Sequence, residues 1–236
     1  MAIAVDSSSP ALASQTSASN TVTTASFTPP AGALLVAAAF CSQNSASPMT
    51  FTLSDSTSGT WTTDLVRNSS DTGSISSVAG IYHATASGAA VTVTCVVASS
   101  FFPTVKVYVL TGVNMASPVG SSAKQSSTST SFATTGYTNA AASSIGIAAA
   151  ANNVANTMTS NDATASSPGA ASNGHYGIAC YKLPLGAAGA TTTHHFETTG
   201  TPSINIVQVE FVAASASLPK SWFVPSNQAV FRSYTR

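Results

Sequence analysis

Residues 33–41 have the sequence ALLVAAAFC, an unbroken apolar run with no charged residue and no turn former. A strand that is covered on both faces shows this continuous pattern, and the run is too short to cross a membrane. Pro29 and Pro30 come shortly before it, and such a pair ends a preceding strand because proline has no backbone N–H. The stretch therefore predicts a central strand in the core of a β-protein.

Further strand patterns flank this run, because Val, Thr, Ile and aromatic residues alternate with polar ones between turn residues. No window shows the apolar spacing and caps of a helix. We expect hairpins between 49–53 and 60–66 and between 77–86 and 90–97. About ten to twelve strands at such spacing predict a two-layer antiparallel β-sandwich of jelly-roll type. The remaining strand segments are 21–28, 105–110, 132–135, 144–149, 176–183, 191–196 and 204–212.

The chain divides into a β-sandwich domain, residues 1–217, and a C-terminal docking arm, residues 218–236. Within the domain, residues 121–131 are mostly Ser and Thr and predict an exposed loop or edge. Residues 152–174 have almost no bulky side chain, which predicts a long loop with room for a short pairing near Thr157. The arm does not alternate like a strand and contains two prolines, so we expect an extended segment that docks elsewhere.

The chain carries very little charge. Only 6% of its 236 residues are charged and the net charge is zero, whereas about a quarter is typical. A surface of Ser, Thr, Asn and Gly does not repel other molecules, so the composition predicts association with copies of the chain or with other proteins. A secreted polar β-domain is the alternative. Clustered Lys and Arg are missing before the arm, which argues against nucleic acid as a partner.

The N-terminal sequence and the spacing of the cysteines predict where the protein folds and whether its cysteines are reduced. The sequence from Met1 to Asp6 has no basic region and no long apolar run, so we expect no signal peptide, no membrane association and folding in a cytoplasm. Cys41, Cys95 and Cys180 are far apart and lie in apolar segments. Their spacing suits neither a zinc site nor a disulfide scaffold, so we expect three reduced cysteines in the core.

Three stretches carry a resemblance to a known domain: SFTPPAGALLVA at 26–37, SDSTSGTWT at 54–62 and YVLTGVNMASPVG at 108–120. They resemble a β-sandwich domain of actinobacteriophage minor tail proteins and related virion proteins, which also occurs in some bacterial surface proteins. The apolar segment INIVQVEFVA at 204–213 matches the last core strand of that domain. Asn114 replaces the Asp expected in its turn, and Asn caps such a turn equally well. The resemblance covers about residues 1–214 and implies a virion protein without giving its position on the particle.

No catalytic or metal site is predicted. His195 and Glu197 are the best metal candidates, since alternate residues of a strand share a face, but His194 points to the other face and two ligands make no tight site. No Gly-x-Ser-x-Gly turn is present and no His has an evident orienting acid. A pair of acids for sugar hydrolysis cannot be assigned by spacing. The acids are Asp6, Asp55, Asp64, Asp71, Asp162, Glu197 and Glu210.

The sequence thus predicts a non-enzymatic structural protein of a tailed-bacteriophage virion, a minor tail or decoration-type protein without cofactor, assembled in the host cytoplasm. Its expected partners are other virion proteins and copies of itself. The alternative is a receptor- or glycan-binding module at the tail tip, which binds a host surface glycan through Trp61, Tyr82, Tyr137 or Tyr176. Aromatic residues and Arg are enriched at binding hot spots, so the expected partner-binding residues lie in the arm: Lys220, Trp222, Phe223, Phe231, Arg232, Tyr234 and Arg236.

Overall fold

The structure, a computed structural model, describes residues 2–15, 19–42, 49–68, 77–98, 102–153, 157–161, 163–166, 177–199 and 203–215. Within these ranges the chain forms strands β1 to β19, all paired in antiparallel fashion where they form sheets, and no helix. The predicted all-β class is confirmed. No helix in these ranges is long and apolar enough to span a membrane. The arm, residues 218–236, lies outside the described residues.

The strands fall into two groups along the chain, which we call the first unit (β1 to β9) and the second unit (β10 to β19). The first unit consists of β1 (Ala4–Val5), β2 (Ala13–Ser14), β3 (Thr21–Thr23), β4 (Leu34–Ser42), β5 (Phe51–Asp55), β6 (Thr62–Arg67), β7 (Ser77–Thr85), β8 (Val93–Val97) and β9 (Thr104–Thr111). The second unit consists of β10 (Val119–Ser127), β11 (Ser131–Ala133), β12 (Tyr137–Thr138), β13 (Ile145–Asn152), β14 (Met158–Ser160), β15 (Thr164–Ser166), β16 (Gly177–Lys182), β17 (Thr191–Thr192), β18 (His195–Thr198) and β19 (Ile204–Phe211).

Each unit contains one large sheet and one small sheet with the same strand order. The large sheet of the first unit has the order β1-β9-β4-β7-β6, with β2 also paired to β9, and its small sheet has the order β3-β8-β5. The large sheet of the second unit has the order β10-β19-β13-β16-β15, and its small sheet has the order β11-β18-β14. When the strands of the two units are matched in chain order, each matched strand has the same neighbours in both units. The pair β12-β17 corresponds to the isolated bridge between Phe27 and Val91.

Hydrogen bonds at the ends of the small sheets support this equivalence. Thr24 exchanges two bonds with Val93, through its backbone N–H and its hydroxyl, and Thr134 does the same with His194. Left-handed backbone conformations also recur, at Gly32 (φ 74°) and Ser143 (φ 60°) before the two central strands. The chain therefore contains the same architectural unit twice.

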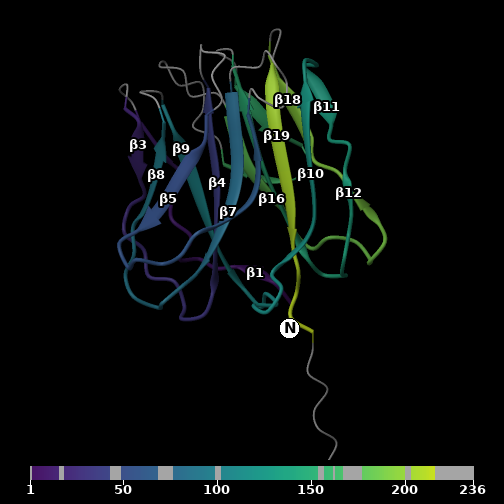
Figure 1. The fold of residues 1–236 in the computed structure, drawn as a ribbon. Coiled ribbons are helices and arrows are strands. Elements are labelled where there is room, and N and C mark those ends of the chain that lie inside the picture. Colours follow the sequence, from purple (N-terminus) through teal and green to yellow (C-terminus); the bar gives the residue numbers. More distant parts are fainter. Residues whose placement is uncertain are drawn as a thin grey trace, which may run out of the picture.

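The two units pack face to face through their large sheets, so that four sheets form a stack (Figure 1). One core fills the first unit and includes Leu35, Ala37 and Val93. A second core lies between the two large sheets, and β4 and β13 contribute to it residues such as Val36 and Ile147. A third core fills the second unit. Successive side chains of β4 thus enter different cores, which explains why every residue of this strand is buried.

Four layers replace the two that the sequence predicts for residues 1–217. The apolar run at 33–41 correctly indicates a strand covered on both faces. The covering layer on one side is the second unit, whose own central strand β13 has the sequence IGIAAAAN and is also buried throughout. Both strands are rich in alanine, whose small side chain takes up little room in the shared core. The pattern revealed burial on two faces but not what covers the second face.

Both predicted hairpins are wrong. β5 pairs with β8 in the small sheet, whereas β6 pairs with β7 in the large sheet. The turn after β5 therefore crosses from one layer to the other, and the Asp55 carboxylate stabilises it by accepting bonds from the N–H groups of Thr57 and Gly59 and from Trp61 Nε1. The turn between β7 and β8 crosses back at Gly88, where φ is 87°. Strong turn residues marked these positions correctly, but local turns do not identify the pairing partner.

Two loop predictions have different outcomes. Residues 121–131 belong largely to β10, which pairs only with β19 and is the edge of its large sheet, so the edge interpretation is confirmed. The short pairing expected near Thr157 within the predicted loop 152–174 is confirmed by β14, whereas the loop prediction is wrong for β15, which also lies within it. These strands pair with β18 and β16 through backbone groups, which require no bulky side chains. Residues 154–156, 162 and 167–176 lie outside the described part.

Candidate functional site

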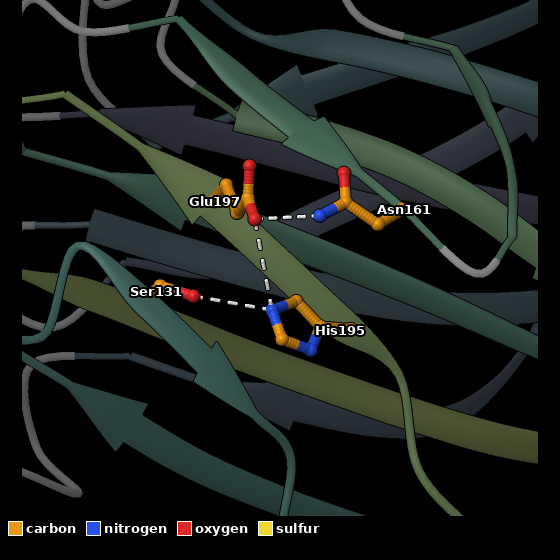
Figure 2. A network of polar contacts seen from close by, with 4 residues as sticks. All are labelled: Ser131, Asn161, His195 and Glu197. Carbon is orange, nitrogen blue, oxygen red and sulfur yellow. Dashed lines mark hydrogen bonds and ion pairs between the residues drawn. The ribbon is translucent and has the colours of Figure 1, made fainter.

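An exposed polar cluster lies on the outer face of the second unit's small sheet (Figure 2). His195 Nε2 lies 3.9 Å from Glu197 Oε1 on the same strand, β18. The side chains remain 38% and 47% exposed. Ser131 Oγ of β11 lies 3.2 Å from the same His195 nitrogen, and Asn161 Nδ2, just after β14, donates to Glu197 Oε1 at 2.6 Å. The predicted shared face of His195 and Glu197 is confirmed, and flanking strands add a hydroxyl and an amide.

This cluster does not have the arrangement of a Ser-His-acid triad. In a triad the serine and the acid contact different nitrogens of the imidazole, so that one accepts a proton while the other is held. Here Ser131 and Glu197 both face Nε2 of His195. His194, the residue before β18, is completely buried and does not join the cluster. The arrangement suits binding of a ligand or ion better than proton transfer.

The first unit provides an internal comparison for the cluster. Its equivalent residues follow from strand register: Thr94 for His195 and Val96 for Glu197. Thr21 and Ser54 correspond to Ser131 and Asn161 in the same way. The equivalent face therefore has no carboxylate, imidazole or amide at these four positions: Thr21, Ser54, Thr94 and Val96. The polar cluster is a feature of the second unit alone. Ser131 and Asn161 were missed from sequence because they lie far from His195 along the chain.

A second unusual group is buried inside the second unit. Glu210 is completely buried in β19 at the position equivalent to Val109. Its Oε2 accepts the backbone N–H groups of Ser121 (3.1 Å) and Ala140 (2.7 Å), and its Oε1 accepts that of Ala141 (3.2 Å). A buried carboxylate needs such donors to offset its lost hydration. Glu210 therefore ties the bulge in β10 and the turn before β13 to the central sheet.

Further polar side chains are buried in the second unit. The Cys180 thiol lies 3.7 Å from His194 Nδ1, and neither residue is exposed. Tyr137 is also buried, and its hydroxyl has no hydrogen-bond partner among the described residues. Burial raises the pKa of Tyr137, and Glu210 and Cys180 raise it further. These groups cannot reach a substrate in solution, so they act within the core.

A third group, Asp64 and His83, lies in the first unit. Asp64 is the extra residue of the bulge in β6, and its Oδ1 lies 2.6 Å from His83 Nδ1. Burial raises the pKa of Asp64, while the bond to His83 and the charge of His83 lower it. His83 also contacts the ring of Phe211 edge-on, at 6.3 Å between centroids. The pair therefore lies where the units meet.

The remaining candidates are mostly core residues. All three cysteines are free and buried, as predicted, and burial raises the pKa of Cys41 to about 12. Of the aromatic residues considered for a glycan, Tyr82 and Tyr137 are buried. Trp61 is half-buried, packs on the first core and donates to Asp55. Tyr176 lies outside the described residues. The described aromatic rings thus provide no open stacking platform.

The partner-binding residues predicted in the arm, 220–236, also lie outside the described residues. Among the residues that the structure describes, no group of three or more His, Cys, Asp or Glu side chains is placed to hold a metal ion. The comparisons add no further assignment: no protein family, no curated protein and no solved structure matches this chain.

Proposed function

We propose that the protein is a non-enzymatic structural component of a tailed-bacteriophage virion, a minor tail or decoration-type protein that acts through protein-protein contacts. The resemblance at 26–37, 54–62 and 108–120 supports this role. The first two of these stretches include the residues before β4 and the turn at Asp55, and the third includes the end of β9 and the connection to β10. The proposed location is the virion, after assembly in the host cytoplasm.

The strand order supports a jelly-roll assignment for each unit. In the first unit the order β1-β9-β4-β7 in one sheet and β3-β8-β5 in the other gives the long antiparallel crossings of that fold. β6 departs from it by joining the large sheet beside β7, and β15 departs in the same way in the second unit. We therefore propose two jelly-roll variants joined in one chain, followed by the C-terminal arm.

The observation that carries the proposed function is the distribution of apolar side chains. Among the described residues, Met115 is the only large hydrophobic side chain that is exposed, at 40%. The arm sequence, in contrast, contains Trp222, Phe223, Phe231 and Tyr234 within 13 residues. The described surface gives these aromatic side chains little to cover, which disfavours folding of the arm over its own sandwich. We propose that the arm binds a different virion protein.

Basic residues support the same interpretation. Of the seven Lys and Arg residues, three lie in the arm: Lys220, Arg232 and Arg236. Arg67 and Lys106 of the described part are engaged within the protein, through Ser126 and Asn205 and through the carbonyl of Pro10. The arm therefore combines aromatic residues with cations, the types that dominate binding hot spots. Its partner would offer an apolar surface bordered by acidic or carbonyl groups.

Deletion of residues 218–236 tests this function. We expect the shortened chain to keep the thermal unfolding midpoint of the full chain and to be lost from assembled particles. The quadruple substitution W222A/F223A/F231A/Y234A in the full chain should have the same effect, while Asn227→Ala serves as a matched control that still enters particles. Unfolding of the shortened chain would show that the arm belongs to the core. Normal incorporation of the quadruple variant would contradict arm-mediated docking.

A further inference from the structure

The exposed cluster on the second unit has the donor types that a first-row transition metal ion prefers. An imidazole nitrogen, a carboxylate, an amide and a hydroxyl come from three adjacent strands and meet over one small area (Figure 2). Nitrogen and oxygen donors of this kind suit Zn²⁺ and its neighbours in the periodic table. Sequence spacing supplied only His195 and Glu197, and the fold adds Ser131 and Asn161.

Distances between the donors agree with coordination of one ion. Zn–N and Zn–O bonds of about 2.1 Å place two ligands of a tetrahedral site about 3.4 Å apart. The observed separations from His195 Nε2 are 3.2 Å to Ser131 Oγ and 3.9 Å to Glu197 Oε1, one on each side of this value. Small side-chain rotations bring both distances to it, since the His195 and Glu197 side chains are partly exposed. The donors are thus spaced for an ion without movement of the backbone.

We propose that this face binds one divalent transition metal ion, with Zn²⁺ as the representative, through His195 Nε2 and the Glu197 carboxylate. Ser131 Oγ supplies an oxygen donor from β11. Asn161 now donates its amide nitrogen to Glu197, and rotation of that amide by half a turn presents Oδ1 instead. Only two strong ligands are present, so the affinity is lower than that of a four-ligand zinc site.

The equivalent face of the first unit explains why this inference concerns one unit only. There, Thr94 and Val96 replace the two strong ligands, and the hydroxyls of Thr23 and Thr94 contact each other at 3.0 Å. The backbone frame is the same, because both small sheets have the same strand order and register. The chain therefore contains its own metal-free control on the same scaffold.

Titration of the full chain with ZnCl₂ by calorimetry tests the proposal. We expect one ion per chain, and about tenfold weaker binding or more in each of the variants His195→Thr and Glu197→Val, which introduce the residues of the first unit. Thr94→Ala is the matched control and should bind as the native chain does. Titration with CoCl₂ should give visible absorption bands that are absent in H195T.

Transplantation of the donors makes the test stricter. The triple variant S54N/T94H/V96E places an amide, an imidazole and a carboxylate on the first unit, where Thr21 already provides a hydroxyl. We expect it to bind two ions. A native chain that binds none, or H195T and E197V variants that bind as tightly as the native chain, would overturn the proposal. A triple variant that still binds one ion would show that the four donors are insufficient, and would overturn it equally.

Discussion

The carboxylate of Glu210 illustrates how one residue can hold three parts of the chain together. It lies where the first unit has Val109, and it accepts backbone bonds from β10 and from the turn that precedes β13. An apolar side chain at this position removes the acceptor of three backbone N–H groups, which lie in a partly buried environment. Its contribution is therefore larger than that of an ordinary polar residue.

We expect Glu210→Val to lower the free energy of unfolding by about 3 kcal/mol, because three partly buried N–H donors lose their acceptor and each such loss costs about 1 kcal/mol, the low end of the range for a buried donor. Urea unfolding of the full chain measures this difference. Glu197→Val is the control, since an exposed substitution changes stability by about 0.5 kcal/mol or less. Equal stability of the E210V and native proteins would contradict the role assigned to the carboxylate.

At the scale of strands, β12 and β13 show how the second unit has different side chains at positions equivalent to those of the first unit. Tyr137 takes the position of Phe27 and Gly146 takes that of Leu35. A Cβ added to Gly146 would collide with the Tyr137 hydroxyl and would lie 3.2 Å from His194 Nε2 and 3.3 Å from Leu185 Cδ2. The Tyr137 hydroxyl, which Phe27 lacks, therefore requires a glycine at position 146.

This pairing predicts an energetic coupling. Gly146→Ala should destabilise the protein by about 1 to 3 kcal/mol through overpacking. Tyr137→Phe removes the hydroxyl, which has no hydrogen-bond partner among the described residues, and should be close to neutral alone. In the Y137F background the cost of G146A should fall measurably, as a double-mutant cycle of denaturant unfolding would report. Strictly additive effects of the two substitutions would contradict the coupling.

Strands were easier to predict from sequence than their partners. Continuous apolar runs revealed β4 and alternation revealed β18 with His195 and Glu197 on one face, because both signals are local. The pairing of β5 with β8 joins residues about forty positions apart, and no local turn encodes it. Ser131 and Asn161 reach the candidate site for the same reason, through sheet register. The equivalence of the units was hidden because Val93 and Val109 of one unit match His194 and Glu210 of the other.

For the whole molecule, the interface between the large sheets determines whether the halves behave as one body. Its core contains residues of both units, such as Ala38 and Ala149, which are completely buried. The connection between the units, residues 112–118, is short and Met115 within it is exposed. Cohesion of the units should thus depend on the packed faces rather than on the covalent link.

A protease recognition sequence inserted between Met115 and Ala116 of the full chain tests this cohesion. After cleavage we expect both halves to elute together in size-exclusion chromatography, with nearly the thermal midpoint of the uncut protein. The same cleaved chain with Ala38→Asp should separate, because it places a charge in the shared core. Separation of the halves without A38D would show that the interface alone does not hold the units.

The stack of four sheets also sets the distance between the two outer sheets of the molecule. Packed sheets lie about 10 Å apart, so the outer face of the first small sheet and that of the second are about 30 Å from each other. The two faces point in opposite directions on a common frame, and one is hydroxyl-rich while the other carries His195 and Glu197. Neighbours attached to the two sides would be kept at that fixed distance and would be of different kinds. In the proposed structural role the chain would act as a spacer with two unlike ends.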